Sequence, residues 1–160
     1  SGINVTVRPI RPEDAKMETD FVSRLSEQTK YFRYHRALQE LTPEMLVRFT
    51  QIDYDREMAF VAVAFNTDGP SIIGVARALI TPDNSDAEFA ILVRSDLKGK
   101  GLGKVLMQKI ISYCKIKGTK QMSGMTMPTN RGMLMLAQNL GFEVDVQFAD
   151  GTADMVLPLN

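Results

Sequence analysis

The spacing of apolar residues predicts several strands in the first half of the chain. Residues 5–10 alternate between apolar and polar side chains, and this period of two, with Pro9 near the end, is typical of an edge strand. Residues 58–65 and 72–80 are almost continuously apolar, which favours two strands buried on both faces and joined as a hairpin through the turn at 66–70. A third strand is predicted at residues 88–93.

Apolar residues return at helical spacing in four other segments. Proline and acidic residues at 11–14 and Thr-Pro-Glu at 42–44 are typical of helix starts. Residues 101–117 and 130–140 are predicted to be amphipathic helices. Their inward side chains are expected to be Leu102, Val105, Leu106, Ile110, Tyr113 and Cys114 in the first, and Met133, Leu134, Leu136, Ala137 and Leu140 in the second. Strands are predicted at 120–127, 142–148 and 153–157, the last two joined at Asp150-Gly151.

The predicted order is therefore βααβββαβαββ, which belongs to the α/β or α+β class with a mixed sheet. The length of 160 residues fits a single domain over residues 1–160. The 19 basic residues balance the 19 acidic ones, so a nucleic-acid partner is disfavoured. No apolar run is long enough for a membrane helix. With one histidine and one cysteine, no metal site is expected, and an unpaired cysteine favours the cytoplasm.

The strongest chemical signal is a buried strand that runs into a glycine-rich turn and then into an amphipathic helix. Glycines alternate through the turn, so backbone can approach a ligand closely, and the start of the helix offers unpaired N–H groups. Basic side chains surround the turn in a chain with no net charge. The candidate site consists of these basic residues, the glycines and the start of the helix: Arg94, Lys98, Gly99, Lys100, Gly101, Leu102, Gly103 and Lys104. Together they predict a site for phosphate groups.

Two common phosphate-binding motifs do not fit this turn. A P-loop needs Gly-Lys followed by Ser or Thr, whereas Lys104 is followed by Val105. A dinucleotide fingerprint, Gly-x-Gly-x-x-Gly, fails at its third glycine whether it is counted from Gly99 or from Gly101.

The turn instead resembles motif A of the GNAT superfamily of acyl-CoA N-acyltransferases, Gln/Arg-x-x-Gly-x-Gly/Ala, with Lys98 in place of the usual Gln or Arg. Residues 130–142 resemble motif B of the same family, except that Ala137 stands where many members carry a tyrosine general acid. The resemblance implies the GNAT fold, a mixed and mostly antiparallel sheet flanked by helices, with acetyl-CoA as co-substrate. It further implies that the turn binds the diphosphate, that backbone N–H groups near Leu92 and Val93 face the thioester, and that Asn130 contacts pantetheine or only caps its helix.

Residues 50–59 and 88–94 are similar to the C-terminal acetyltransferase domain of bacterial Pat-type protein lysine acetyltransferases. This resemblance implies a lysine on a protein such as acetyl-CoA synthetase as the acceptor. It also implies acyl-CoA-synthetase-like domains ahead of this one in a longer parent chain. Two alternatives stay open: a GNAT enzyme that acts on a small amine, or a non-catalytic domain that senses acyl-CoA.

Glu88 is the candidate general base, because an acceptor lysine with a pKa of about 10.4 must lose a proton before it can attack a thioester. GNAT enzymes often carry a catalytic glutamate on the corresponding strand. The alternatives for Glu88 are a solvated carboxylate or a structural ion pair. Cys114 falls on the apolar face of its helix, so core packing is favoured over a nucleophilic role. His35 is expected to be structural.

Overall fold

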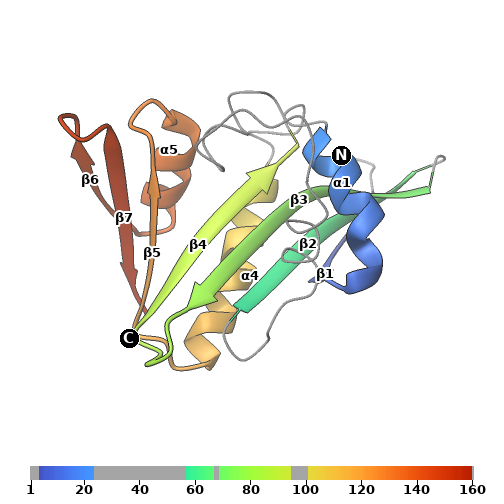
Figure 1. Cartoon of the computed structure of the whole chain (residues 1–160), viewed down its shortest axis with the longest axis horizontal. Coiled ribbons are helices and arrows are strands. Elements are labelled where there is room, and N and C mark those ends of the chain that lie inside the picture. The colour runs from blue at the N-terminus through green and yellow to red at the C-terminus, as the bar shows by residue number, and fades with distance from the viewer. Residues whose placement is uncertain (1–3, 24–56, 67–68, 95–100, 160) are drawn as a thin grey trace.

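The computed structural model describes residues 4–23, 57–66, 69–94 and 101–159, which form one sheet with helices on both faces (Figure 1). The sheet has seven strands in the order β1-β2-β3-β4-β5-β7-β6. The strands are β1 (Asn4–Pro9), β2 (Glu57–Asn66), β3 (Gly69–Ile80), β4 (Asp86–Val93), β5 (Gln121–Thr126), β6 (Glu143–Gln147) and β7 (Thr152–Pro158). The helices are the 3-10 turn η1 (Pro12–Asp14), α1 (Ala15–Ser23), α4 (Leu102–Ile116) and α5 (Arg131–Asn139).

The predicted class and most of the predicted elements are confirmed. Every strand pair is antiparallel except β4–β5, so the sheet is mixed and mostly antiparallel. β3 begins earlier than expected, at Gly69, and β4 begins at Asp86 rather than Glu88. The helix expected after Thr42, and His35, lie outside the described residues. Within the described parts of the chain, none of the helices is both long and apolar enough to cross a membrane.

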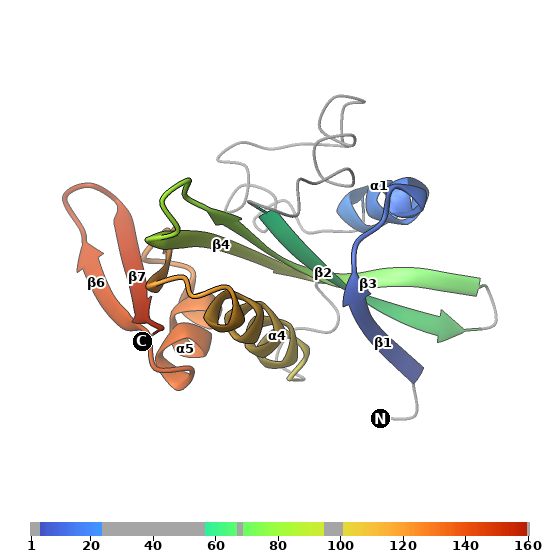
Figure 2. The same ribbon diagram turned by 90° about the horizontal axis from the view of Figure 1, so that it is seen from below.

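The sheet separates two hydrophobic cores, with α1 on one face and α4 and α5 on the other (Figure 2). The buried face of α4 consists of Leu106, Met107, Ile110, Ile111 and Cys114. The prediction that Val105 points inward is wrong, because its side chain is 44% exposed. Residues at i, i+1, i+4, i+5 and i+8 face the sheet, and at 100° per residue Val105 points away from the centre of this stripe.

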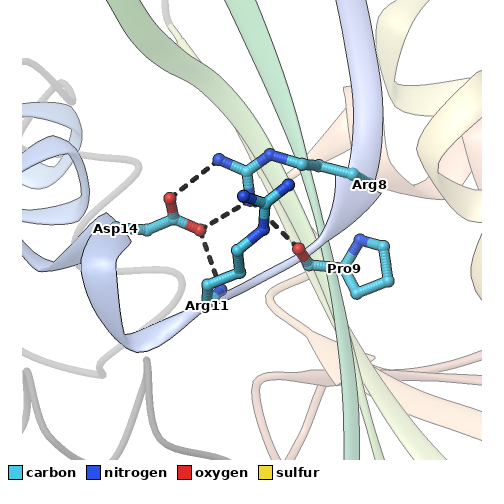
Figure 3. A network of polar contacts seen from close by, with 4 residues as sticks. All are labelled: Arg8, Pro9, Arg11 and Asp14. Carbon is cyan, nitrogen blue, oxygen red and sulfur yellow. Dashed lines mark hydrogen bonds and ion pairs between the residues drawn. The ribbon is translucent and has the colours of Figure 1, made fainter.

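An ion pair fixes the start of α1 against β1 (Figure 3). Arg8 donates two hydrogen bonds of 2.8 Å to the carboxylate of Asp14, and the backbone N–H of Arg11 donates a third. Asp14 is 2% exposed. Burial raises the pKa of Asp14, but the bonds from Arg8 and Arg11 outweigh it and hold the pKa below its ordinary value. Arg8 therefore supplies two of these three hydrogen bonds and the opposite charge of the ion pair.

Replacing Arg8 with alanine is expected to destabilise the fold by about 3 kcal/mol, because a buried carboxylate loses its charged partner. Thermal unfolding should show a fall in Tm of about 6–12 °C. The exposed Lys16, replaced by alanine, is the control. Since the folded-state pKa of Asp14 is lowered, its contribution to stability is complete above pH ~4 and is lost as pH falls further. An Arg8→Ala protein with the Tm of the Lys16→Ala protein would contradict this assignment.

Candidate active site

β4 and β5 lie side by side only at one end and then diverge (Figure 1). Their parallel ladder contains three pairs and stops at Glu88–Ser123. Beyond this point β4 continues to pair with β3 as far as Val93, and β5 continues to pair with β7 as far as Thr126. An opening between two strands of one sheet leaves main-chain hydrogen-bonding groups available along its sides. This opening leads towards the start of α4.

The alternation of the β3–β4 ladder shows which β4 amides face the opening. At its two ends, Thr81 donates to the carbonyl of Asp86, and Arg94 donates to the carbonyl of Ile73. Bonded and non-bonded pairs alternate in an antiparallel ladder, so the even-numbered β4 residues bond to β3. The N–H of Leu92 is therefore directed to β3, whereas those of Ile91 and Val93 are directed to the opening. The sequence proposed the N–H groups of Leu92 and Val93, and of these two only that of Val93 faces the opening. The N–H of Ile91, which was not predicted, faces it as well.

Glu88 lies at the closed end of the opening, in the last pair of the β4–β5 ladder. Its side chain is exposed, and it belongs to the face of the sheet that carries α1. The side chains of Ile91 and Val93 lie on the other face, against the core under α4 and α5. Glu88 and Val93 are five residue steps apart along an extended chain, a span of about 17 Å. The single strand β4 therefore carries the Glu88 carboxylate at the closed end of the opening and the N–H groups of Ile91 and Val93 further along it.

At the closed end of the opening, Asp86, the first residue of β4, links β4 to β5 through side-chain hydrogen bonds. Its two carboxylate oxygens accept hydrogen bonds from the side chains of Gln121 (3.0 Å) and Ser123 (2.9 Å) on β5. The loop before β4 is also tied to the end of α4, because Asn84 accepts a 2.6 Å bond from Thr119. The position of Glu88 therefore depends on cross-strand contacts that sequence spacing alone did not reveal.

The start of α4 lies where β4 ends and presents N–H groups that have no acceptor within the helix. Gly101 caps the helix with a φ of 87°, a left-handed conformation that favours glycine. The first bond within the helix runs from Val105 to the carbonyl of Gly101, so the N–H groups of residues 102–104 lack an intrahelical acceptor. Lys104 is exposed beside them. The predicted phosphate-binding residues Lys98, Gly99 and Lys100 lie outside the described residues.

The other predicted residues of the turn contribute to packing. A Cβ built on Gly103 would lie 3.3 Å from Leu136 of α5 and 3.7 Å from Ile91 of β4, so this glycine lets the helix approach both elements. The side chain of Leu102 packs into the core under α4, which leaves only its backbone to face a ligand. Arg94 follows β4 and is half-buried.

Asn130 caps α5 at the open end of β5. Its side-chain oxygen accepts the N–H of Met133 at 3.3 Å, and its amide nitrogen donates to the hydroxyl of Thr126 at 3.1 Å. The cap predicted from the sequence is confirmed; contact with pantetheine stays a prediction. Ala137, at the family's tyrosine position, is fully buried and carries no proton to donate.

Cys114 is fully buried in the core, as predicted. Burial raises the pKa of its thiol to about 11, against a smaller opposing effect of Lys117. We expect a thiol-specific reagent at pH 8 to leave the folded protein unmodified and to react at once after denaturation. Rapid labelling of the native protein, measured by mass spectrometry, would contradict the assignment of Cys114 to the core.

The family model of the acetyltransferase (GNAT) domain matches residues 4–143, and the chain belongs to this family. It is 34% identical to an acetyltransferase of Pseudomonas aeruginosa over 141 residues, which cover 88% of this chain and 76% of that protein. It is 26% identical to the acetyltransferase Pat of Mycolicibacterium smegmatis over 136 residues, which cover 84% of this chain and 40% of that protein.

Solved structures support the same fold. The crystal structure of the GNAT domain of S. lividans PAT superimposes with a TM-score of 0.85 and 23% identity, covering 96% of this chain and 90% of that one. Spermidine N-acetyltransferase from Vibrio cholerae, solved in complex with CoA and spermine, superimposes with a TM-score of 0.73 and 17% identity, covering 97% of this chain and 95% of that one. The GNAT fold expected from the sequence is therefore confirmed.

Proposed function

We propose that this acetyltransferase moves the acetyl group of acetyl-CoA to the side-chain amine of a lysine on a protein such as acetyl-CoA synthetase. One observation supports acetyl-CoA as the donor: the β4–β5 ladder ends at Glu88, although both strands continue beyond it. The opening offers the N–H groups of Ile91 and Val93 to an extended acyl chain. The start of α4 offers N–H groups and a positive dipole end to phosphates.

Glu88 takes up the amine proton in the proposed reaction. An acceptor lysine is mostly protonated at neutral pH, and only its neutral form can attack the thioester carbon. As the new C–N bond forms, negative charge collects on the thioester oxygen, and a backbone N–H directed into the opening stabilises it; that of Ile91 lies nearer to Glu88 than that of Val93. The C–S bond then breaks and releases the thiolate of CoA. Because a thiol has a pKa of about 8.5, its thiolate is a fair leaving group without an acid at Ala137.

The protein acceptor is supported by the resemblance to Pat-type protein lysine acetyltransferases and by the similarity to proteins named Pat. A small amine is the second candidate, supported by the similarity in fold to spermidine N-acetyltransferase. The two candidates share the donor and the role of Glu88, and they differ only in what approaches the exposed side of that residue.

Labelled acetyl-CoA incubated with the protein and a cell lysate separates these candidates. The proposal expects label on lysine residues of one or a few proteins, identified by mass spectrometry, and a rate of labelling about a hundredfold lower with a Glu88→Gln control. Label confined to polyamines or other small amines would favour the second candidate. If the protein binds acetyl-CoA but transfers label to no amine, the catalytic assignment is wrong.

A further inference from the structure

The point at which β4 and β5 part coincides with an unusually close contact between Phe89 and Gly124. If the register of the parallel ladder continued past Glu88–Ser123, these two residues would form the next pair. A Cβ built on Gly124 would lie only 2.4 Å from Cε1 of Phe89 and 2.8 Å from its Cζ. The aromatic ring therefore occupies the space in which any larger residue at position 124 would place its side chain. Glycine inside a strand is typical of such a close approach.

Neighbouring elements prevent both residues from moving apart freely. Phe89 is 6% exposed, and its ring lies 5.2 Å from that of Phe142, centroid to centroid. Gly124 is held from the other side, because it pairs with Met155 of β7, which is 1% exposed. Packed interiors respond to an added methyl group by displacing side chains or backbone. A change at this contact would therefore be transmitted to the strands themselves.

Beyond this contact the two strands pack against different elements, β4 against the start of α4 and β5 against β7. The side chain of Ile91 on β4 packs near Gly103, at the start of α4. β5 follows β7 through the pair Thr126–Ala153. The contact between Phe89 and Gly124 therefore lies at the vertex of the opening, one residue beyond the last ladder pair and two residues before the first N–H directed into it.

We infer that Phe89 and Gly124 are positioning residues that fix where the β4–β5 ladder ends, and so keep the N–H groups of Ile91 and Val93 available to acetyl-CoA. Neither residue needs to touch the donor. The ring packed on the bare backbone of Gly124 ends regular pairing, and the amides beyond it stay directed into the opening. The inference rests on the donor half of the proposed function and is independent of the acceptor.

Gly124→Ala tests the inference, with Gly132→Ala as the matched control. A Cβ on Gly132, in α5, would meet none of the described atoms within 4 Å. We expect Gly124→Ala to raise the Kd for CoA and the KM for acetyl-CoA about tenfold or more, because small displacements at a binding site have large effects. Gly132→Ala should leave both constants unchanged. If the contact is merely structural, Gly124→Ala lowers Tm and leaves the KM for acetyl-CoA as it was, which would overturn the inference.

Phe89→Leu and the double variant Phe89→Leu/Gly124→Ala make the test independent of whether Gly124→Ala folds. The shorter leucine leaves room that the added methyl group partly fills, so the total side-chain volume is nearly conserved. We expect each single variant to raise the KM for acetyl-CoA, and the double variant to lie nearer to wild type than either. Unchanged KM in Phe89→Leu, or effects that simply multiply in the double variant, would overturn the inference.

Failure of this inference and failure of the proposed function give different results. If the wild-type protein binds no CoA in titration calorimetry, the donor assignment itself is wrong. If the wild-type protein binds CoA and the folded Gly124→Ala protein binds it equally well, only the role of the vertex is wrong.

Discussion

Glu88→Gln is expected to lower kcat about a hundredfold or more while the Kd for CoA stays within about twofold of wild type. Glutamine has the shape of glutamate but does not take up a proton at neutral pH, so the variant removes general-base catalysis and little else. Glu88 is exposed on the α1 face, so its replacement by glutamine should leave the sheet intact. Steady-state kinetics with saturating acetyl-CoA, together with titration calorimetry, would separate the two quantities.

Glu143→Gln is the matched control for this prediction. Glu143 is also exposed, and the register connects it through Val156 and Ser123 to Glu88, in the same row and on the same face of the sheet. The two variants therefore change the charge of this face equally, and Glu143→Gln should keep the wild-type kcat. An equal loss of kcat in both variants would show that the charge of this face matters, and that Glu88 is not a general base. No loss in either would remove Glu88 from the mechanism.

Gly101→Glu is expected to weaken CoA binding about tenfold to a hundredfold. The added carboxylate would lie at the start of α4, where it competes with the phosphates for the same N–H groups and repels them. Among the described residues, no atom lies within 4 Å of a Cβ built at this position, so the change adds charge without a clash in the core. Titration calorimetry with CoA measures the effect directly.

Gly118→Glu controls for the backbone strain in that variant. Gly118 follows the other end of α4 with a φ of 79°, so a glutamate there is strained in the same way. Tm should fall by a similar amount in both variants, whereas CoA affinity should fall only in Gly101→Glu. Comparable affinities in the two proteins would mean that the glycine-rich turn does not bind the phosphates.

The strands and helices were largely predictable because their signals are local. The continuous apolar runs of β2 and β3, and the helical repeat of α4, depend only on neighbouring residues. Val105 was the exception: its i+3 spacing from Leu102 fits a helical repeat, but the centre of the buried helix face depends on which strands lie beneath it. The glycine-rich turn was also visible, since its residue types and order carry the family resemblance.

By itself the sequence determined the class of the fold, its elements, the acetyltransferase family and the candidate base Glu88. Only the tertiary structure decided that β7 lies between β5 and β6, that the β4–β5 ladder ends at Glu88, and that Ile91 and Val93 direct their amides into the opening. The physical reason is that the hydrophobic periodicity of a strand or helix depends on only a few consecutive residues. The end of a ladder depends instead on residues far apart in the chain, here a Phe89 ring seated on the bare backbone of Gly124.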